Sequence, residues 1–362
     1  MKKIDLIVGA RPNFIKAFPV YEELVKVENF DLRLINTGQH YDKNMADIFF
    51  KQLNMKKPDI DLMVGSGSHA EQTGKIMMGM EKVLLENRPD LVIVFGDVNS
   101  TVAVALAASK LHIPIAHVEA GLRSFDRTMP EEINRVLTDQ ISDYLFITSP
   151  EAKDNLLKEG KKEDQIFFVG NTMIDSLVKF EKFFDSREFL KKLNFVFQDY
   201  ILVTIHRPAN VDVTMKLNEL IDALNIISES QPIIWPVHPR IKKIIDKYAV
   251  NLNANIFITE PIGYLEFMGL QKNANIIITD SGGIQEESTY FGVPCYTVRD
   301  NTERPVTISQ GTNILAGTNF TTLPNIIFNN KKDKRRNAIP PLWDGKSSER
   351  IKSVIINYFE NG

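Results

Sequence analysis

The sequence predicts an α/β protein built on parallel β-sheets that are covered by helices. Short apolar runs rich in Val and Ile, the composition of strands buried on both faces, alternate with helical patterns along the whole chain. The run at residues 276–278 passes through Thr279-Asp280-Ser281 and two glycines into a helical pattern, the order of a strand, a turn and a covering helix. A length of 362 residues gives room for about two domains, each large enough for its own core.

Composition and charge exclude several classes of function. Lys and Arg number 43 and Asp and Glu 46, so the net charge of −3 gives no electrostatic footprint for nucleic acid; the basic run at 331–336 is interpreted as a solvated loop. The single cysteine, Cys295, excludes an internal disulfide, fits a reducing compartment and is expected to be a small buried apolar residue. The run at 4–8 predicts a strand, not a signal peptide, and no run approaches the ~20 residues of a membrane span. We expect a cytoplasmic protein with no membrane partner.

The first half of the chain predicts one sheet whose loops carry charged residues. Its strands are expected at residues 4–8, 32–36, 91–95, 113–118, 144–148 and 166–169. Arg11 and Lys16 follow the first strand, in the loop and the first turns of the next helix. Two cations near a helix N-terminus oppose the helix dipole, so a bound anion would explain them. Ligands of open α/β sheets bind at this edge of the sheet.

Carboxylates collect at the same edge. Asp97 and Glu119 each follow one of two strands expected to be neighbours, and Glu131 lies in the first turn of a later helix. Glu131 and Arg135 are four residues apart, the spacing of an ordinary surface pair. Clustered carboxylates repel one another and are hard to justify for stability. They suit acid/base chemistry, in which one group is held protonated while another is ionised.

The second half predicts another sheet, after a plausible hinge at Gly170-Asn171. Its strands are expected at residues 200–205, 233–237, 256–258, 276–278 and 296–298, and a last helix at 347–359. His206 follows the first of these strands, and a histidine in such a place is as often structural or solvated as functional. Arg304 lies in a loop after the last strand, where it could meet an anion.

The stretch at 275–294 carries the strongest phosphate-binding signal. Ser281-Gly282-Gly283 stands between strand and helix, so free N–H groups and the positive end of the helix dipole would face a ligand. The glycines alone favour an ordinary strand-to-helix turn. Glu287, one helical turn further on, favours a nucleotide diphosphate, because a carboxylate near bound phosphate makes sense if it holds ribose hydroxyls. The segment at 65–70 superficially matches a dinucleotide fingerprint but follows a poor strand, so no nicotinamide is expected.

Motifs spread in order over nearly the whole chain form one joint pattern. They are Gly9-Ala10-Arg11-Pro12 with Lys16, Thr37-Gly38-Gln39-His40, Gly96-Asp97, His117-Val118-Glu119-Ala120-Gly121-Leu122-Arg123, Pro130-Glu131-Glu132-Ile133-Asn134-Arg135, Thr204-Ile205-His206-Arg207, Asp280-Ser281-Gly282-Gly283-Ile284-Gln285-Glu286-Glu287 and Thr302-Glu303-Arg304-Pro305. This pattern resembles the non-hydrolysing UDP-N-acetylglucosamine 2-epimerase family. The resemblance implies a GT-B architecture, in which two Rossmann-like domains with parallel sheets face across a cleft, usually in a homodimer. The expected domains are 1–170 plus 346–362, and a UDP-binding domain at 171–345.

The resemblance also implies site roles. The catalytic residues would be Asp97, Glu119, Glu131 and His206. The UDP-sugar would be bound by Arg11, Lys16, Arg135, Ile262, Phe267, Ser281, Gly282, Gly283, Glu287 and Arg304. In this arrangement Ser281-Gly282-Gly283 lies at the diphosphate, Glu287 at the ribose, and the backbone near Ile262 and Phe267 at the uracil. The family implies no metal and no cofactor.

The implied reaction inverts carbon 2 of a UDP-2-acetamido sugar and converts UDP-N-acetylglucosamine to UDP-N-acetylmannosamine for polysaccharide biosynthesis. UDP is eliminated to give 2-acetamidoglucal and is then added back. The alternative is an epimerase of UDP-2,3-diacetamido-2,3-dideoxyglucuronic acid, because the segment at 67–74 also occurs in such relatives. A GT-B glycosyltransferase shares the diphosphate-binding helix but does not need three carboxylates. A non-catalytic UDP-sugar-binding regulator is disfavoured because every acid/base position is filled.

Two departures from the family pattern bear on substrate and regulation. Relatives that need UDP-N-acetylglucosamine as an activator carry Gln-His-Arg followed by Gln or Glu, whereas here Gln39-His40 is followed by Tyr41-Asp42. The segment at 206–210 lacks the Glu often found before its Asn. Asp42 would offer only acceptors, and its charge would face a diphosphate. The departures predict a weakened activator site, to which His238 could still contribute.

Overall fold

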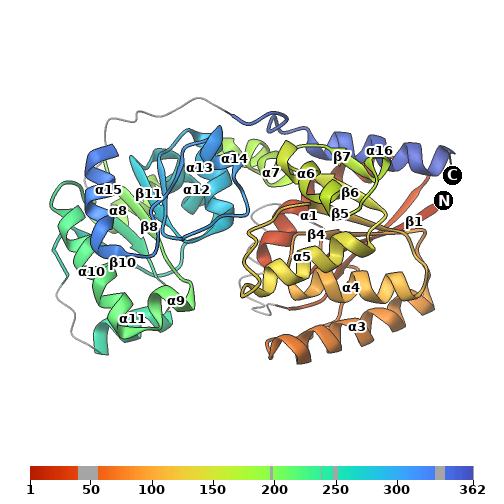
Figure 1. The fold of residues 1–362 in the computed structure, drawn as a ribbon, viewed down its shortest axis with the longest axis horizontal. Coiled ribbons are helices and arrows are strands. Elements are labelled where there is room, and N and C mark those ends of the chain that lie inside the picture. Colours follow the sequence, from red (N-terminus) through yellow and green to blue (C-terminus); the bar gives the residue numbers. More distant parts are fainter. Residues whose placement is uncertain (40–55, 196–198, 238, 248–251, 331–338, 362) are drawn as a thin grey trace. The chain divides into compact units, whose positions relative to one another are not determined.

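The chain forms two compact units. The computed structural model describes residues 1–39, 56–195, 199–237, 239–247, 252–330 and 339–361. Unit 1 comprises Met1–Lys179 and Pro341–Gly362, and unit 2 comprises Phe180–Pro340 (Figure 1). Each unit is a parallel α/β structure, which confirms the predicted fold class. The expected hinge at Gly170-Asn171 lies within unit 1. Sequence predictions for His40, Tyr41, Asp42, His238 and the basic run at 331–336 concern residues outside this description.

Within its described residues, unit 1 contains a seven-stranded parallel sheet in the order β3-β2-β1-β4-β5-β6-β7. The strands are β1 (Lys2–Val8), β2 (Phe30–Asn36), β3 (Ile60–Asp61), β4 (Leu91–Phe95), β5 (Ile115–Ala120), β6 (Tyr144–Ile147) and β7 (Ile166–Phe168). All except β3 match expected strands. At two residues β3 is too short to show a hydrophobic pattern. Strand β4 is buried at every position, as its apolar run predicts.

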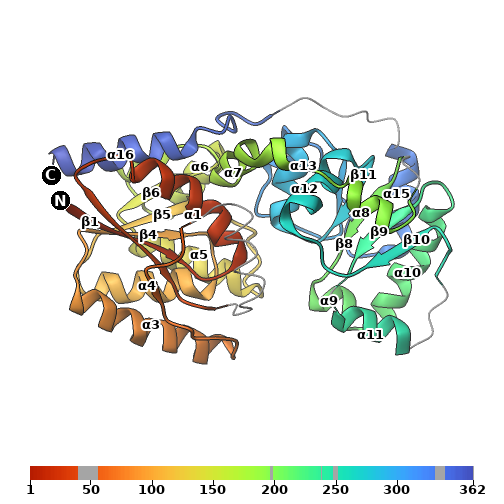
Figure 2. The ribbon, with the colours of Figure 1, turned by 180° about the vertical axis from the view of Figure 1, so that it is seen from behind.

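Helices cover both faces of this sheet. They are α1 (Arg11–Leu24), α3 (His69–Glu86), α4 (Asn99–Lys110), α5 (Pro130–Ile141), α6 (Pro150–Lys158), α7 (Thr172–Phe180) and α16 (Ser347–Asn361). Helices α3 and α4 pack side by side on one face, and α1 and α16 pack together on the other (Figure 2). Helix α5 lies beside α4, so its side chains reach the carboxyl ends of β4 and β5.

The part of unit 2 that the structure describes contains a six-stranded parallel sheet in the order β10-β9-β8-β11-β12-β13. Its strands are β8 (Ile201–Thr204), β9 (Ile233–Pro236), β10 (Ile256–Thr259), β11 (Ile276–Thr279), β12 (Cys295–Thr297) and β13 (Asn313–Leu315). The short β13 was not expected from the sequence. The helices are α8 (Arg187–Lys192), α9 (Pro208–Val211), α10 (Thr214–Ser228), α11 (Pro239–Lys247), α12 (Tyr264–Asn273), α13 (Gly282–Phe291), α14 (Val306–Ser309) and α15 (Leu323–Asn330).

In each sheet the first strand of the unit lies between two sets of strands, and the chain fills one side of it before the other. In unit 1 the chain adds β2 and β3 on one side of β1 and the strands from β4 to β7 on the other. Unit 2 repeats the arrangement around β8, with β9 and β10 on one side and the strands from β11 to β13 on the other. Open parallel sheets bind ligands outside the carboxyl ends of their strands at such a switch point. The topology therefore places a ligand at the ends of β1 and β4 in unit 1 and of β8 and β11 in unit 2.

Two expectations from composition can be compared with the structure. Cys295 is buried in β12, and burial raises the pKa of its thiol to about 11, so it behaves as a small apolar residue. Among the helices described, none is long and apolar enough to cross a membrane.

Two buried contacts tie the C-terminal segment to unit 1. Trp343 is buried, and its Nε1 donates to the carbonyl of Thr148 at 3.0 Å. The carboxylate of Asp175 in α7 accepts from the N–H groups of Ser347 at 3.1 Å and Ser348 at 2.7 Å. Burial raises the pKa of Asp175 despite these hydrogen bonds. Asp175 thus caps the N-terminus of α16, a helix far away in the sequence.

Removing the Asp175 carboxylate should loosen α16. In Asp175→Ala the N–H groups of Ser347 and Ser348 lose their acceptor, which should lower the unfolding free energy by about 1–2 kcal/mol and speed amide hydrogen exchange in α16. Asp344→Ala is the control, because the partly exposed Asp344 pairs with Arg350 at the surface, where ion pairs contribute at most about 1 kcal/mol. Equal exchange rates in the two variants would contradict the capping role.

Candidate functional site

Glu119 is aimed by a bulge at the end of β5. The pairing of β5 with β6 shifts register between Val118 and Ala120, and Glu119 between them has a φ of +76°. Such a left-handed backbone costs a non-glycine residue about 1–3 kcal/mol and is typical of functional sites. The carboxylate of Glu119 is buried and lies beside the first helix of the unit.

Lys16 of α1 compensates the charge of this carboxylate. Its Nζ forms a salt bridge with Glu119 Oε2, and both side chains are buried. Gly96 leaves room for the pair, because a Cβ at this position would lie 3.2 Å from Lys16 Nζ and 3.7 Å from Glu119 Oε2. Asn13, also in α1, donates to the carbonyl of Phe95 at 2.8 Å. The start of α1 is therefore tied to the end of β4, where the next carboxylate lies.

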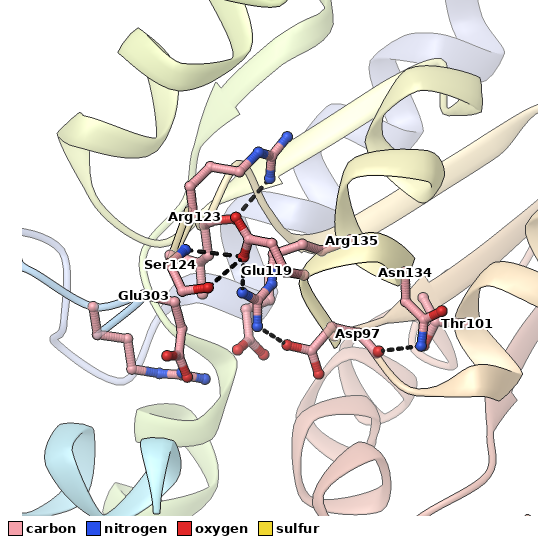
Figure 3. Close-up of polar contacts among 12 residues, drawn as sticks. Asp97, Thr101, Glu119, Arg123, Ser124, Asn134, Arg135 and Glu303 are labelled. Carbon is pink, nitrogen blue, oxygen red and sulfur yellow. Dashed lines mark hydrogen bonds and ion pairs between the residues drawn. The ribbon is translucent and has the colours of Figure 1, made fainter. Parts of the chain in front are cut away.

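That next carboxylate is Asp97, which Arg135 joins to helix α5. Arg135 is buried, and its Nη2 contacts Asp97 Oδ2 (Figure 3). Its Nη1 contacts Glu132 Oε2. Asn134 donates to the backbone carbonyl of Asp97 at 3.0 Å. The Asp97 side chain is 22% exposed, so it reaches solvent while its other side contacts the buried guanidinium of Arg135. The structure thus brings Asp97, Glu119, Lys16 and Arg135 to one edge of the sheet, as predicted.

The two glutamates at the start of α5 have different surroundings. Glu132 is buried, accepts from the N–H groups of Ser124 and Phe125 at 2.9 Å each, and contacts Arg135. Glu131, expected in the carboxylate cluster, is exposed. Sequence reasoning missed Glu132, although its spacing of three residues from Arg135 places both on one helix face. The acid/base role of Glu131 stays a prediction.

A fully buried polar network lies behind Glu119. Asp139 Oδ1 is 2.7 Å from His117 Nδ1, and Asp139 Oδ2 is 2.7 Å from Arg123 Nη1. His117 Nε2 lies 2.8 Å from the carbonyl oxygen of Gly96. Burial alone would raise the pKa of Asp139, but His117 and Arg123 outweigh it and hold this pKa below its ordinary value. An ionised carboxylate therefore supports the edge of the sheet from inside.

In unit 2, helix α13 begins at the carboxyl end of β11, as the strand-glycine-helix pattern predicts. Ser281 is the N-cap residue, and the described residues provide no side-chain capping hydrogen bond there. A Cβ at Gly282 would lie 2.6 Å from Arg304 Nη1 and 2.7 Å from Glu303 Oε1, so a larger residue would force these side chains to move. The structure thus brings Ser281, Gly282, Gly283 and Arg304 together at a helix N-terminus, a place that favours an anion.

Arg304 is held in place by buried carboxylates. Its Nε lies 2.9 Å from Glu286 Oε1, and its Nη1 contacts Glu303 Oε1. Glu303 also pairs with Arg299 at 2.8 Å. All four side chains are buried. The position of the Arg304 guanidinium is therefore set before any ligand arrives, so little side-chain entropy remains to be lost on binding.

His206 lies at the neighbouring strand end and contacts a buried aspartate. His206 Nδ1 is 2.9 Å from Asp280 Oδ1, and the histidine side chain is 61% exposed. Asp280 also accepts from the N–H of Arg207 at 2.8 Å and from Asn210 Nδ2 at 3.0 Å. Burial alone would raise the pKa of Asp280, but the contact with His206 and then the hydrogen bonds from Arg207 and Asn210 outweigh it and hold the pKa below its ordinary value. Asp280 orients an imidazole that solvent can reach.

The other residues expected at the nucleotide have less distinctive surroundings. Glu287 is buried, and Gln271 Nε2 donates to its Oε2 at 2.7 Å. Ile262 and Phe267 are half-buried and pack against the core of unit 2. Arg11 is half-buried at the start of α1. The structure places these residues without testing their roles, which stay predictions.

The two units offer complementary chemistry. Unit 1 has two carboxylates with fixed cationic partners, an arrangement suited to proton transfer. Unit 2 has a helix N-terminus, a fixed guanidinium and an exposed imidazole, an arrangement suited to a phosphate. No group of three or more His, Cys, Asp and Glu side chains in the described part of the chain could hold a metal ion.

Comparisons with known proteins give a consistent family. The family model described as UDP-N-acetylglucosamine 2-epimerase matches residues 22–356. The UDP-N-acetylglucosamine 2-epimerase of Methanocaldococcus jannaschii is 48% identical, over 98% of both chains. A crystal structure of the Methanocaldococcus jannaschii enzyme in complex with UDP-GlcNAc and UDP gives a TM-score of 0.89 at 47% identity, covering 98% of this chain and 99% of that one. The UDP-2,3-diacetamido-2,3-dideoxy-D-glucuronate 2-epimerase of Pseudomonas aeruginosa is 44% identical, over 87% of this chain and 88% of its own.

The neighbouring glutamates of α5 should differ sharply in their effect on stability. Glu132→Gln leaves the buried Arg135 without one of its carboxylates, which should lower the unfolding free energy of unit 1 by about 3 kcal/mol. Glu131→Gln changes an exposed side chain and should stay within about 0.5 kcal/mol of the wild type. Urea unfolding followed by circular dichroism measures both. Similar losses in the two variants would mean that the buried pair does not stabilise α5.

Proposed function

The chain belongs to the UDP-N-acetylglucosamine 2-epimerase family, an enzyme family of GT-B fold, and we propose that it interconverts UDP-N-acetylglucosamine and UDP-N-acetylmannosamine. The observation that carries this proposal is the pair of carboxylates in unit 1. Glu119 is held in a strained backbone conformation against Lys16, and Asp97 is held against Arg135. A protein that only bound a UDP-sugar would have no use for this strain, whereas inversion at carbon 2 requires positioned acid and base groups.

The first half-reaction is an elimination. A carboxylate of unit 1 takes the proton from carbon 2, and the electron pair of that C–H bond forms the double bond between carbons 1 and 2. The bond between carbon 1 and the UDP oxygen breaks, and UDP leaves with its electron pair. The products are 2-acetamidoglucal and UDP. The N–H groups at the start of α13 and the Arg304 guanidinium support this step, because they stabilise negative charge on the leaving diphosphate.

The second half-reaction adds UDP back. Its β-phosphate oxygen forms the bond to carbon 1, and the electron pair of the double bond takes a proton from a second group on the opposite face of carbon 2. Inversion needs acid/base groups on both faces of the sugar, and Asp97, Glu119 and Glu131 are the residues proposed to supply them. Lys16 and Arg135 hold the charges of the first two, so each can change protonation state at a fixed position.

We further propose that unit 2 binds the UDP moiety. Ser281, Gly282 and Gly283 would hold the diphosphate, as the N-terminal position of these residues on α13 supports. Glu287 would accept the ribose hydroxyls, and the backbone near Ile262 and Phe267 would contact the uracil. His206 and Arg11 would meet phosphate or sugar. The exposure of His206 and its contact with Asp280 support this role, because the imidazole is both oriented and accessible.

A second candidate substrate is UDP-2,3-diacetamido-2,3-dideoxyglucuronic acid. The relative that is 44% identical and named as an epimerase of that sugar favours it. Both candidates undergo the same chemistry at carbon 2 and differ in the groups on carbons 3 and 5. Incubation of the protein with each sugar in deuterated water, without an acceptor, separates them. The substrate exchanges its carbon 2 hydrogen and forms its isomer.

The wider setting is also a proposal. An exposed apolar pair on α5, Ile133 at 43% and Leu137 at 46%, supports a homodimer, because the two side chains share one face of the helix. The single cysteine, Cys295, is buried and forms no disulfide, which supports a reducing compartment such as the cytoplasm. The product would serve as a precursor for polysaccharide biosynthesis.

The carboxylates should be required for turnover but not for nucleotide binding. Asp97→Asn, Glu119→Gln and Glu131→Gln should each lower the epimerisation rate by roughly 100-fold or more, because each amide neither accepts nor delivers the proton. Each should still bind UDP with wild-type affinity. Glu163→Gln, at an exposed surface pair, is the matched control and should leave turnover unchanged. Near-normal rates in all three variants would refute the assignment.

The diphosphate seat should respond to Gly282 and Arg304. Gly282→Leu should abolish UDP binding, because even its Cβ would collide with the Arg304 guanidinium. Arg304→Ala should weaken UDP binding by about 1.5–3 kcal/mol, the contribution of a charge-assisted hydrogen bond. Titration calorimetry with UDP measures both, with Arg187→Ala, a surface arginine of the same unit, as the control. Unchanged affinity in both site variants would place the nucleotide elsewhere.

A further inference from the structure

We infer that Asp139 is a positioning residue, which sets the geometry of both Asp97 and Glu119 from inside unit 1. The inference deepens the proposed function and rests on it. Asp139 lies on α5 and is fully buried, so it acts on a substrate only through other residues.

Asp139 grips the β5 bulge on both sides of Glu119. Its Oδ1 lies 2.7 Å from His117 Nδ1, and its Oδ2 accepts from the N–H of Gly121 at 3.0 Å. His117 and Gly121 are each two residues away from Glu119 in the chain. A left-handed backbone at a non-glycine residue persists only when its surroundings over-determine it. The Asp139 carboxylate supplies that restraint, because it contacts the chain at His117 before the bulge and at Gly121 after it.

The same network reaches Asp97 through His117. The other ring nitrogen of His117 lies 2.8 Å from the carbonyl oxygen of Gly96, the residue before Asp97. Both ring nitrogens face oxygens, so both must donate for both hydrogen bonds to form. The ionised Asp139 accepts one of these hydrogen bonds, and Arg123 links Asp139 to the partly exposed Glu159. Through one imidazole, Asp139 is thus connected to the ends of β4 and β5.

Helix α5 makes the coupling rigid. It carries Asp139, and one turn earlier Arg135, which contacts Asp97. Asp97 is therefore held by its side chain through Arg135 and at the preceding peptide through His117. A displacement of α5 would move both contacts together. The proposed acid/base groups consequently share one support, although they lie on different strands.

The test is the kinetics of Asp139→Asn, an isosteric change that removes the charge. The variant should fold, bind UDP with wild-type affinity and keep KM within about threefold, while kcat falls by about 100-fold. Exchange of the carbon 2 hydrogen in deuterated water should fall by the same factor. Asp143→Asn is the matched control: Asp143 accepts from the N–H of Ile115, at the opposite end of β5, and its loss should change kcat less than twofold.

A double-mutant cycle separates positioning from a merely structural role. If Asp139 acts through Glu119, combining Asp139→Asn with Glu119→Gln should slow the enzyme far less than the product of the two single effects. Multiplying effects would overturn the inference, as would full activity in a folded Asp139→Asn. If Asp139→Asn does not fold, His117→Gln decides, because it breaks the imidazole link but leaves Asp139 with Gly121 and Arg123. Its kcat should fall at least tenfold, and an unchanged kcat would overturn the inference.

Failure of the proposed function gives a different result. A wild-type protein that neither exchanges the carbon 2 hydrogen nor forms an isomer from either UDP-sugar would refute that function, and the inference would fall with it. An active wild type with an equally active Asp139→Asn would refute only the inference.

Discussion

The structure of unit 1 depends on compensating the charge of carboxylates that the fold buries at one edge of a sheet. The buried carboxylates and their cationic partners are Glu119 with Lys16, Glu132 with Arg135, and Asp139 with Arg123; Asp139 also contacts His117. A buried carboxylate without a partner would be strongly destabilising. Helices α1 and α5 carry several of these partners, so charge compensation also determines where the two helices dock. The same ion pairs therefore fix the geometry of the site and stabilise the unit.

This arrangement gives similar groups different environments. Glu119 lies on the bulged strand β5, is buried and pairs with the ammonium group of Lys16. Asp97 is partly exposed and pairs with the guanidinium of Arg135. Two carboxyl groups with different surroundings are suited to different steps of proton transfer. Glu132 is equally buried but accepts backbone N–H groups, so its oxygens are engaged in holding the loop before α5. Proximity to the site therefore does not by itself assign a chemical role.

Unit 1 places carboxylates at its sheet edge, whereas unit 2 places positively charged groups and a helix N-terminus at its own. Its central feature is the close approach of Arg304 to Gly282 at the start of α13. Buried carboxylates on Glu286 and Glu303 hold the guanidinium there, while Asp280 collects backbone N–H groups and the imidazole of His206. Glu286, Glu303 and Asp280 therefore act as supports, while the cationic groups and the helix N-terminus are placed to contact a ligand.

The sequence by itself determined the α/β class, most strands of both sheets and the residues that end them, because these follow from local hydrophobic patterns and from glycine and proline. It also brought Asp97 and Glu119 to one edge, since parallel strands share the direction of their carboxyl ends. It did not reveal β3 and β13, which are too short to show a pattern. Only the tertiary structure decided that Glu132 is buried while Glu131 is exposed, that Glu119 takes a left-handed backbone, and that Asp139 reaches His117 and Gly121. These features depend on the register of β5 against β6 and on the docking of α5. Both are set by contacts between residues distant in the sequence, which no local pattern specifies.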